Sequence, residues 1–107
     1  MAFIEIGEEW IVGTYDHGYM VGKSAITFDA KTGKDREAIR NPEYFRELSD
    51  CVEFAYKSMA REKLGSHRKN IPLESAIREL REFEAELKET IGPIRRIEER
   101  LAKEVTK

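Results

Sequence analysis

The sequence has very little cysteine, and this scarcity excludes several kinds of site. Cys51 is the only cysteine among 107 residues, so no disulfide can form within the chain. The paired-cysteine motifs of zinc ribbons and redox sites are absent for the same reason. Cys51 lies near an expected helix start without a neighbouring histidine, so we interpret it as a half-buried thiol rather than a nucleophile.

Histidine is also scarce, and the sequence motifs of common enzymes are missing. His17 and His67 are the only two histidines, and neither has a second histidine or a cysteine at metal-ligand spacing. The chain contains no GxSxG, P-loop or GxGxxG sequence. We therefore expect no metal and no cofactor, and predict that the protein is not an enzyme.

Long apolar runs are absent as well. No segment approaches 18 consecutive apolar residues, and the first residues, "MAFIEIGEEW", have neither the basic region nor the apolar core of a signal peptide. These features predict a cytoplasmic protein without a membrane span. The net charge of −2 argues against a general nucleic-acid coat protein, although it leaves room for a local basic patch.

What the sequence does contain changes along its length. Nine of the ten aromatic residues lie at or before Tyr56, and five of the seven glycines lie at or before Gly33. The later part is rich in Glu, Lys, Arg, Leu, Ile and Ala. We expect one domain over residues 1–107, with a β-rich half over 1–46 and a helical half over 47–107. The predicted fold class is α+β, with a small antiparallel sheet packed on one amphipathic helix and followed by a long C-terminal helix.

The β-rich half is expected to form short strands rich in β-branched and aromatic residues. The predicted strands cover residues 3–6, 10–15 and 19–28, and a polar loop covers 29–35. A further antiparallel strand is predicted over 36–40, ending before Pro42 because the residue that precedes proline is restricted.

The stretch "GTYDHGYMVGK", Gly13 to Lys23, has two interpretations. As a tight hairpin, it would place positive φ at Gly18 and set Tyr15 and Tyr19 opposite each other. As a ligand-binding hairpin, its aromatic rings would stack on a base while His17 and Lys23 contact phosphate. The spacing alone favours the simple turn.

The helical half begins with a clear amphipathic pattern. Ser49 is a good N-cap candidate, the predicted helix runs to about Leu64, and Gly65 suits its end. Pro72 then fits the first turn of a second helix over residues 72–107. Leucine or isoleucine recurs every seven residues from this point, which is typical of a coiled-coil seam.

This seam predicts self-association as a dimer or tetramer, because an isolated helix would leave it exposed. The sequence "IGPI" interrupts it with glycine and proline, so the helix either kinks at Gly92–Pro93 or turns back as a hairpin. The predicted oligomerisation residues are Leu73, Ile77, Leu80, Leu87, Ile91, Ile94 and Leu101.

A basic stretch, "REKLGSHRKN", carries a charge of +3 between Arg61 and Asn70 in an otherwise acidic protein. It would either complement a helix C-terminus or bind an anion such as a nucleotide phosphate. Combined with the hairpin and the predicted strand over 36–40, it gives a set of candidate ligand-binding residues: Trp10, Tyr15, His17, Tyr19, Lys23, Arg36, Arg40, Arg61, Arg68 and Lys69.

Four stretches carry a family resemblance: "GTYDHGYMVGK", "DAKTGKD", "AIRNPEYFRELSDCVEFAYKSMAREKL" and "SAIRELREFEAEL". Their order resembles a family of small uncharacterised proteins encoded by bacteriophages and prophages, with an aromatic hairpin, an amphipathic helix and a Glu/Lys-rich C-terminal helix. The resemblance implies a phage counter-defence protein in the host cytoplasm. It would sequester a nucleotide-type immune signal or inhibit a host defence protein. The alternative is a nucleic-acid-binding phage regulator that acts as a dimer.

Overall fold

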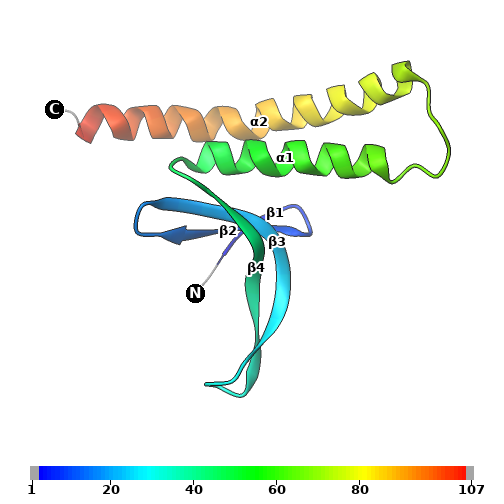
Figure 1. Cartoon of the computed structure of the whole chain (residues 1–107). Coiled ribbons are helices and arrows are strands. Elements are labelled where there is room, and N and C mark those ends of the chain that lie inside the picture. Colours follow the sequence, from blue (N-terminus) through cyan, green and yellow to red (C-terminus); the bar gives the residue numbers. More distant parts are fainter. Residues whose placement is uncertain (1–2, 106–107) are drawn as a thin grey trace. The chain divides into compact units, whose positions relative to one another are not determined.

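The computed structural model of the chain describes residues 3–105. The chain forms two compact units, Met1–Cys51 and Val52–Lys107, which we describe one at a time. The first contains four strands and the second is helical, so the α+β class predicted from the sequence is confirmed (Figure 1). Within the described residues, neither helix is both long and apolar enough to cross a membrane.

The first unit is built on a four-stranded antiparallel sheet whose strands follow one another in sequence order. Its buried side chains include Trp10, Val12 and Val21, and strand alternation places all three on one face of the sheet. The strands are β1 (Ile4–Ile6), β2 (Trp10–Tyr15), β3 (Gly18–Asp29) and β4 (Lys34–Phe45).

The last two strands are longer than the others and continue beyond them. β2 pairs with β3 only as far as Lys23, so the rest of β3 pairs with β4 alone. We call residues 23–29 and 34–40 the β3–β4 ribbon, and Figure 1 shows it projecting from the sheet to a tip at the 30–33 turn. Since β4 lies at the sheet edge, one side of this strand has no neighbour in the sheet.

The prediction that the last strand ends before Pro42 is wrong, because β4 runs on to Phe45. Two features allow proline here. β4 is an edge strand, and its pairing with β3 is irregular beside Pro42, where Asn41 has a φ of 47°. Proline is tolerated at edges and bulges, where its missing N–H breaks no ladder hydrogen bond.

The hairpin at Gly13–Lys23 is confirmed as a tight turn, but with a different register from the predicted one. Asp16 and His17 form a two-residue turn, so Tyr15 pairs with Gly18 rather than facing Tyr19. A shift of one residue moves a side chain to the opposite face, so the two tyrosines lie on different faces. Glycine is required at position 18, since a Cβ there would lie 2.4 Å from the Phe45 carbonyl oxygen.

The second unit pairs α2 (Leu73–Val105) in antiparallel fashion with α1 (Leu48–Gly65), whose first four residues belong to the first unit. α1 begins at Leu48, before the predicted N-cap Ser49, so Ser49 lies inside its first turn instead of capping it. α2 begins at Leu73, so Pro72 directly precedes the helix instead of lying in its first turn as predicted. Its carbonyl accepts hydrogen bonds from the N–H groups of Ser75 and Ala76, as the carbonyl of an N-cap residue does.

Interactions from one end of the helix pair to the other fix its alignment. The Arg95 guanidinium donates to Glu53 at 2.9 Å, and the Tyr56 and Thr90 hydroxyls lie 3.3 Å apart. Farther along, the Lys63 ammonium lies 5.8 Å from the centre of the Phe83 ring. In these three contacts, residue numbers increase along α1 while they decrease along α2, so the two helices run antiparallel.

α2 continues through Pro93 as one helix, so the chain does not turn back there. Of the two alternatives at Gly92–Pro93, the helical hairpin is therefore wrong. Proline lacks the N–H that would bond to the carbonyl four residues earlier, and the helix tolerates this loss at one turn. Ile91, beside the interruption, is 5% exposed and belongs to the buried interior.

Candidate functional site

The pairing of β3 with β4 gathers lysine and arginine side chains on one face of the ribbon. Lys23 lies directly opposite Arg40, and Thr27 lies opposite Arg36. Lys34 pairs with Asp29 at the outer end of the ribbon. Directly paired residues point to the same side of a sheet, and so do residues two apart. Four cations therefore share what we call the cationic face: Lys23, Lys34, Arg36 and Arg40.

Strand alternation explains this gathering. The start of β4 reads "KDREAIR", in which lysine and arginine occupy positions 34, 36 and 40 while Asp35 and Glu37 occupy the odd positions. The acids therefore point to the opposite face, where Glu37 accepts a hydrogen bond from the Ser24 hydroxyl at 2.5 Å. One strand thus separates charges that lie next to one another in the sequence.

A bulge sets the inner end of the cationic face. Between the pairs Val21–Glu43 and Lys23–Arg40, β3 advances two residues while β4 spans three. The extra residue brings Arg40 onto the face of Lys23. Gly22 makes this close packing feasible, because a Cβ there would lie 2.6 Å from the Arg40 carbonyl oxygen.

The surroundings of the cations differ along the face. The Lys23 ammonium lies 6.0 Å from the centre of the Trp10 ring and 3.8 Å from a Glu9 carboxylate oxygen. Within the described part of the chain, Lys34, Arg36 and Arg40 form no ion pair, and all three are exposed. Their donors are therefore available to phosphate or carboxylate oxygens.

The structure brings together only part of the predicted ligand-binding set. Trp10, Lys23, Arg36 and Arg40 share the face described above, and Tyr19 lies on the same side of the sheet at its other end. These five residues form the largest group within that set that the first unit places on one face.

Tyr15 and His17 lie apart from that group. The Tyr15 ring contacts the Tyr44 ring edge-on at 5.3 Å, and its centre lies 6.2 Å from the His17 ring. Tyr15 pairs with Gly18, one position out of phase with Tyr19, so its ring lies on the face opposite Tyr19. The aromatic hairpin therefore does not present all its rings to one ligand.

The predicted basic stretch belongs to the second unit. Arg61, Arg68 and Lys69 are exposed there. The connector that carries the last two is anchored to α2, since His67 Nε2 lies 2.9 Å from a Glu79 carboxylate oxygen. This contact gives one of the two histidines a structural partner, and no group of three or more His, Cys, Asp or Glu residues in the described chain is placed to hold a metal ion.

The predicted oligomerisation residues divide into two sets on α2. Ile91 is buried, and Leu87 and Ile94 are half-buried. The remaining four are exposed: Leu73, Ile77, Leu80 and Leu101. The middle of the seven-residue repeat is thus buried or half-buried within the protein, while the residues at its two ends are exposed.

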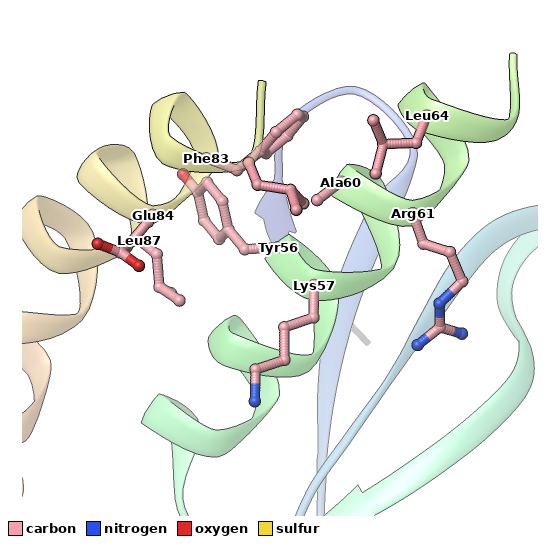
Figure 2. Close-up of a pocket in the computed structure, with 9 residues that line it drawn as sticks. Tyr56, Lys57, Ala60, Arg61, Leu64, Phe83, Glu84 and Leu87 are labelled. Atoms are coloured by element: carbon pink, nitrogen blue, oxygen red, sulfur yellow. The ribbon is translucent and has the colours of Figure 1, made fainter. Parts of the chain in front are cut away.

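Leu80 and Leu87 also line a groove of about 410 Å³ between the two helices. Figure 2 shows Tyr56, Phe83 and Leu87 at the helix pair, with Lys57 and Arg61 extending from α1. The groove is lined by Tyr56, Lys57, Ala60, Arg61, Leu64, Leu80, Phe83, Glu84 and Leu87.

Sequence reasoning missed Lys34, because it assigned residues 29–35 to a loop. The signal was present in the alternating charges of "KDREAIR", which fit a strand with one basic and one acidic face. Comparison with known proteins adds no further assignment: no family model, curated protein or solved structure matches the chain. The resemblance to phage proteins and the expected counter-defence role stay predictions.

Proposed function

We propose that the protein binds nucleic acid, with the cationic face of the β3–β4 ribbon lying against a duplex backbone. One observation carries this proposal. The pairing of β3 with β4 places four cations on one face and turns Asp35 and Glu37 to the other. Asp29, opposite Lys34, is the one acid that the ribbon places on the cationic face, so positive charge predominates there. Such a surface attracts a polyanion even when the net charge of the whole chain is −2.

The length of the cationic face favours a polymer over a single nucleotide. Lys34 and Arg40 are six residues apart, which corresponds to about 20 Å along an extended strand. One phosphate group cannot reach donors spread over that length. A nucleic-acid strand presents phosphates at regular intervals, so each cation can meet its own.

The form of the ribbon favours double-stranded DNA among nucleic acids. The major groove of B-DNA, about 12 Å wide, accepts a two-stranded β-ribbon, whereas the corresponding groove of double-stranded RNA is deep and narrow. Arg36 forms no ion pair with any of residues 3–105 and lies near the middle of the face, opposite Thr27. It is the side chain that we expect to contribute most to binding.

Fluorescence anisotropy with a labelled 20-base-pair DNA duplex tests this proposal. With four cations engaged, log K should fall against log salt with a slope of about −3.6. Arg36→Ala should weaken binding and reduce the magnitude of the slope by about 0.9. Arg96→Ala removes an exposed arginine of α2 instead and should leave both quantities unchanged.

Two results would contradict the proposal. One is the absence of binding at 20 mM salt, and the other is an equal loss of affinity in the Arg36 and Arg96 variants. The expected nucleotide-binding surface draws on Arg61, Arg68 and Lys69 as well as the hairpin, and it stays a prediction. Binding of free nucleotides that survives Arg36→Ala but not Arg68→Ala would favour that surface instead.

A further inference from the structure

The exposed apolar residues near the start of α2 form a strip that is suited to self-association. Leu73, Ile77 and Leu80 recur at spacings of four and three, so they lie along one side of the helix. Their exposed fractions are 76%, 39% and 44%. We call these three residues the α2 strip. At its inner end, Leu80 also lines the groove between α1 and α2, so apolar surface continues from the strip into the groove.

The charges beside the strip are arranged to match a second copy. Glu74 and Arg81 are exposed, lie one seven-residue repeat apart and follow Leu73 and Leu80 in the chain. They therefore occupy equivalent positions on the same flank of the strip. Both residues also border a hollow with Ile77 and Arg78.

This arrangement selects one orientation of the two copies. In an antiparallel pair with a two-fold axis near Ile77, Glu74 of each copy lies beside Arg81 of the other. Two symmetric ion pairs then flank the apolar contact. In a symmetric parallel pair, the flank of one helix that carries Glu74 and Arg81 faces the opposite flank of the other, so these two residues would not meet across the contact. The α2 strip is thus complementary to itself only when the helices run in opposite directions.

We propose that two copies of the chain associate through the α2 strip, with their α2 helices antiparallel and each Glu74 paired with Arg81 of the other copy. The proposal commits to a dimer and gives Leu101 no part in it. It is independent of the nucleic-acid proposal, because all its residues lie in the second unit. The strip spans about 10 Å of helix, so we expect a dimer that dissociates in the micromolar range.

Sedimentation equilibrium of the full chain between 1 and 500 µM tests the dimer directly. The wild type should shift from monomer to dimer with concentration. Ile77→Glu should remain monomeric throughout, while its circular dichroism stays that of the wild type because Ile77 is exposed. Leu101→Ala, which truncates another exposed apolar residue of α2, should dimerise as the wild type does.

Charge exchange tests the orientation. Glu74→Lys and Arg81→Glu should each weaken dimerisation about tenfold, because each turns both attractive pairs into repulsive ones. The double variant should regain wild-type affinity, and so should an equal mixture of the two single variants. That recovery also shows that the single variants are folded.

Three outcomes would overturn the proposal. The first is a wild type that is monomeric at 500 µM. The second is a dimer that Ile77→Glu leaves intact, and the third is a dimer in which the two charge changes do not compensate. A monomer that binds an unrelated helix on the same strip would count among these failures, because it would assign the strip to another occupant.

Discussion

Lys23 and Arg40 lie directly opposite each other on β3 and β4, with both side chains on the same face of the ribbon. Like charges at directly opposed positions destabilise a sheet by up to about 1 kcal/mol. The Glu9 carboxylate, 3.8 Å from the Lys23 ammonium, offsets part of this repulsion, but Arg40 has no such partner within the described residues. The pair is therefore unfavourable for the stability of the free protein.

Removing one of these charges should stabilise the first unit. Arg40→Gln is expected to raise its free energy of unfolding by about 0.2–1 kcal/mol, because the repulsion with Lys23 is lost. Arg36→Gln is the matched control, since the same substitution opposite Thr27 relieves no like-charge pair. Urea unfolding followed by the fluorescence of Trp10, the only tryptophan, measures both. Equal stabilities for the two variants would contradict this explanation.

The sequence predicts the fold class and most elements, because these depend on local patterns. The content of aromatic, β-branched and glycine residues indicates the β-rich half, and the spacing of Val52 and Ala55 indicates a helix whose buried side they occupy. The sequence could not show that β4 passes Pro42. That outcome depends on the strand lying at a sheet edge, which is a property of the assembled sheet.

The candidate site is predicted less well from the sequence, because it depends on the register in which the strands pair. The sequence identifies Lys23, Arg36 and Arg40 individually as candidates, but their shared face depends on which residues of β3 and β4 are paired. A two-residue turn also separated Tyr15 from Tyr19, which the sequence had placed together. Side chains alternate with a period of two, so a one-residue error in pairing reverses every assignment along a strand.

The close approach at Gly22 leads to a second prediction. Gly22→Ala should lower the free energy of unfolding by about 1–3 kcal/mol, because the new Cβ would lie 2.6 Å from a backbone oxygen that cannot move away easily. Gly92→Ala is the same change in the interior of α2, where nothing lies within 4 Å of an added Cβ. It should stabilise the helix by about 0.5–1 kcal/mol. Urea unfolding measures the change in the free energy of unfolding, which should have opposite signs in the two variants. Trp10 fluorescence follows the first variant and circular dichroism at 222 nm follows the second.

The Gly22 variant also links stability to the proposed function. The added methyl group would press on the backbone at Arg40, so the cationic face should lose its inner end and DNA binding should weaken. Gly92→Ala should leave binding unchanged. If Gly22→Ala kept full stability, the bulge would not be as closely packed as the structure shows.

The Glu53 carboxylate links α1 to α2, and its protonation at low pH should weaken the contact between the two helices. Its carboxylate lies 2.8 Å from the Lys57 ammonium and accepts a hydrogen bond from Arg95 at 2.9 Å. The hydrogen bond from Lys57, with the charges of Lys57 and Arg95, lowers the pKa of Glu53 below its ordinary value of 4.5. A carboxyl group whose pKa is lower in the folded state stabilises that state when it is ionised.

The direction of the pH effect follows from that lowered pKa. The stabilisation is fully present above about pH 4.5, the ordinary pKa, and is lost as the pH falls through the lower pKa of the folded state. Glu53→Gln should therefore destabilise the second unit at pH 7 by about 1 kcal/mol or less, and the difference from the wild type should shrink towards pH 3. Circular dichroism at 222 nm during thermal unfolding measures this difference at each pH.

Glu84→Gln is the control, because both side chains of its ion pair with Lys88 are exposed and the pair should contribute little at either pH. A Glu53→Gln difference that stayed constant from pH 7 to pH 3 would show that the carboxylate charge does not stabilise the helix pair.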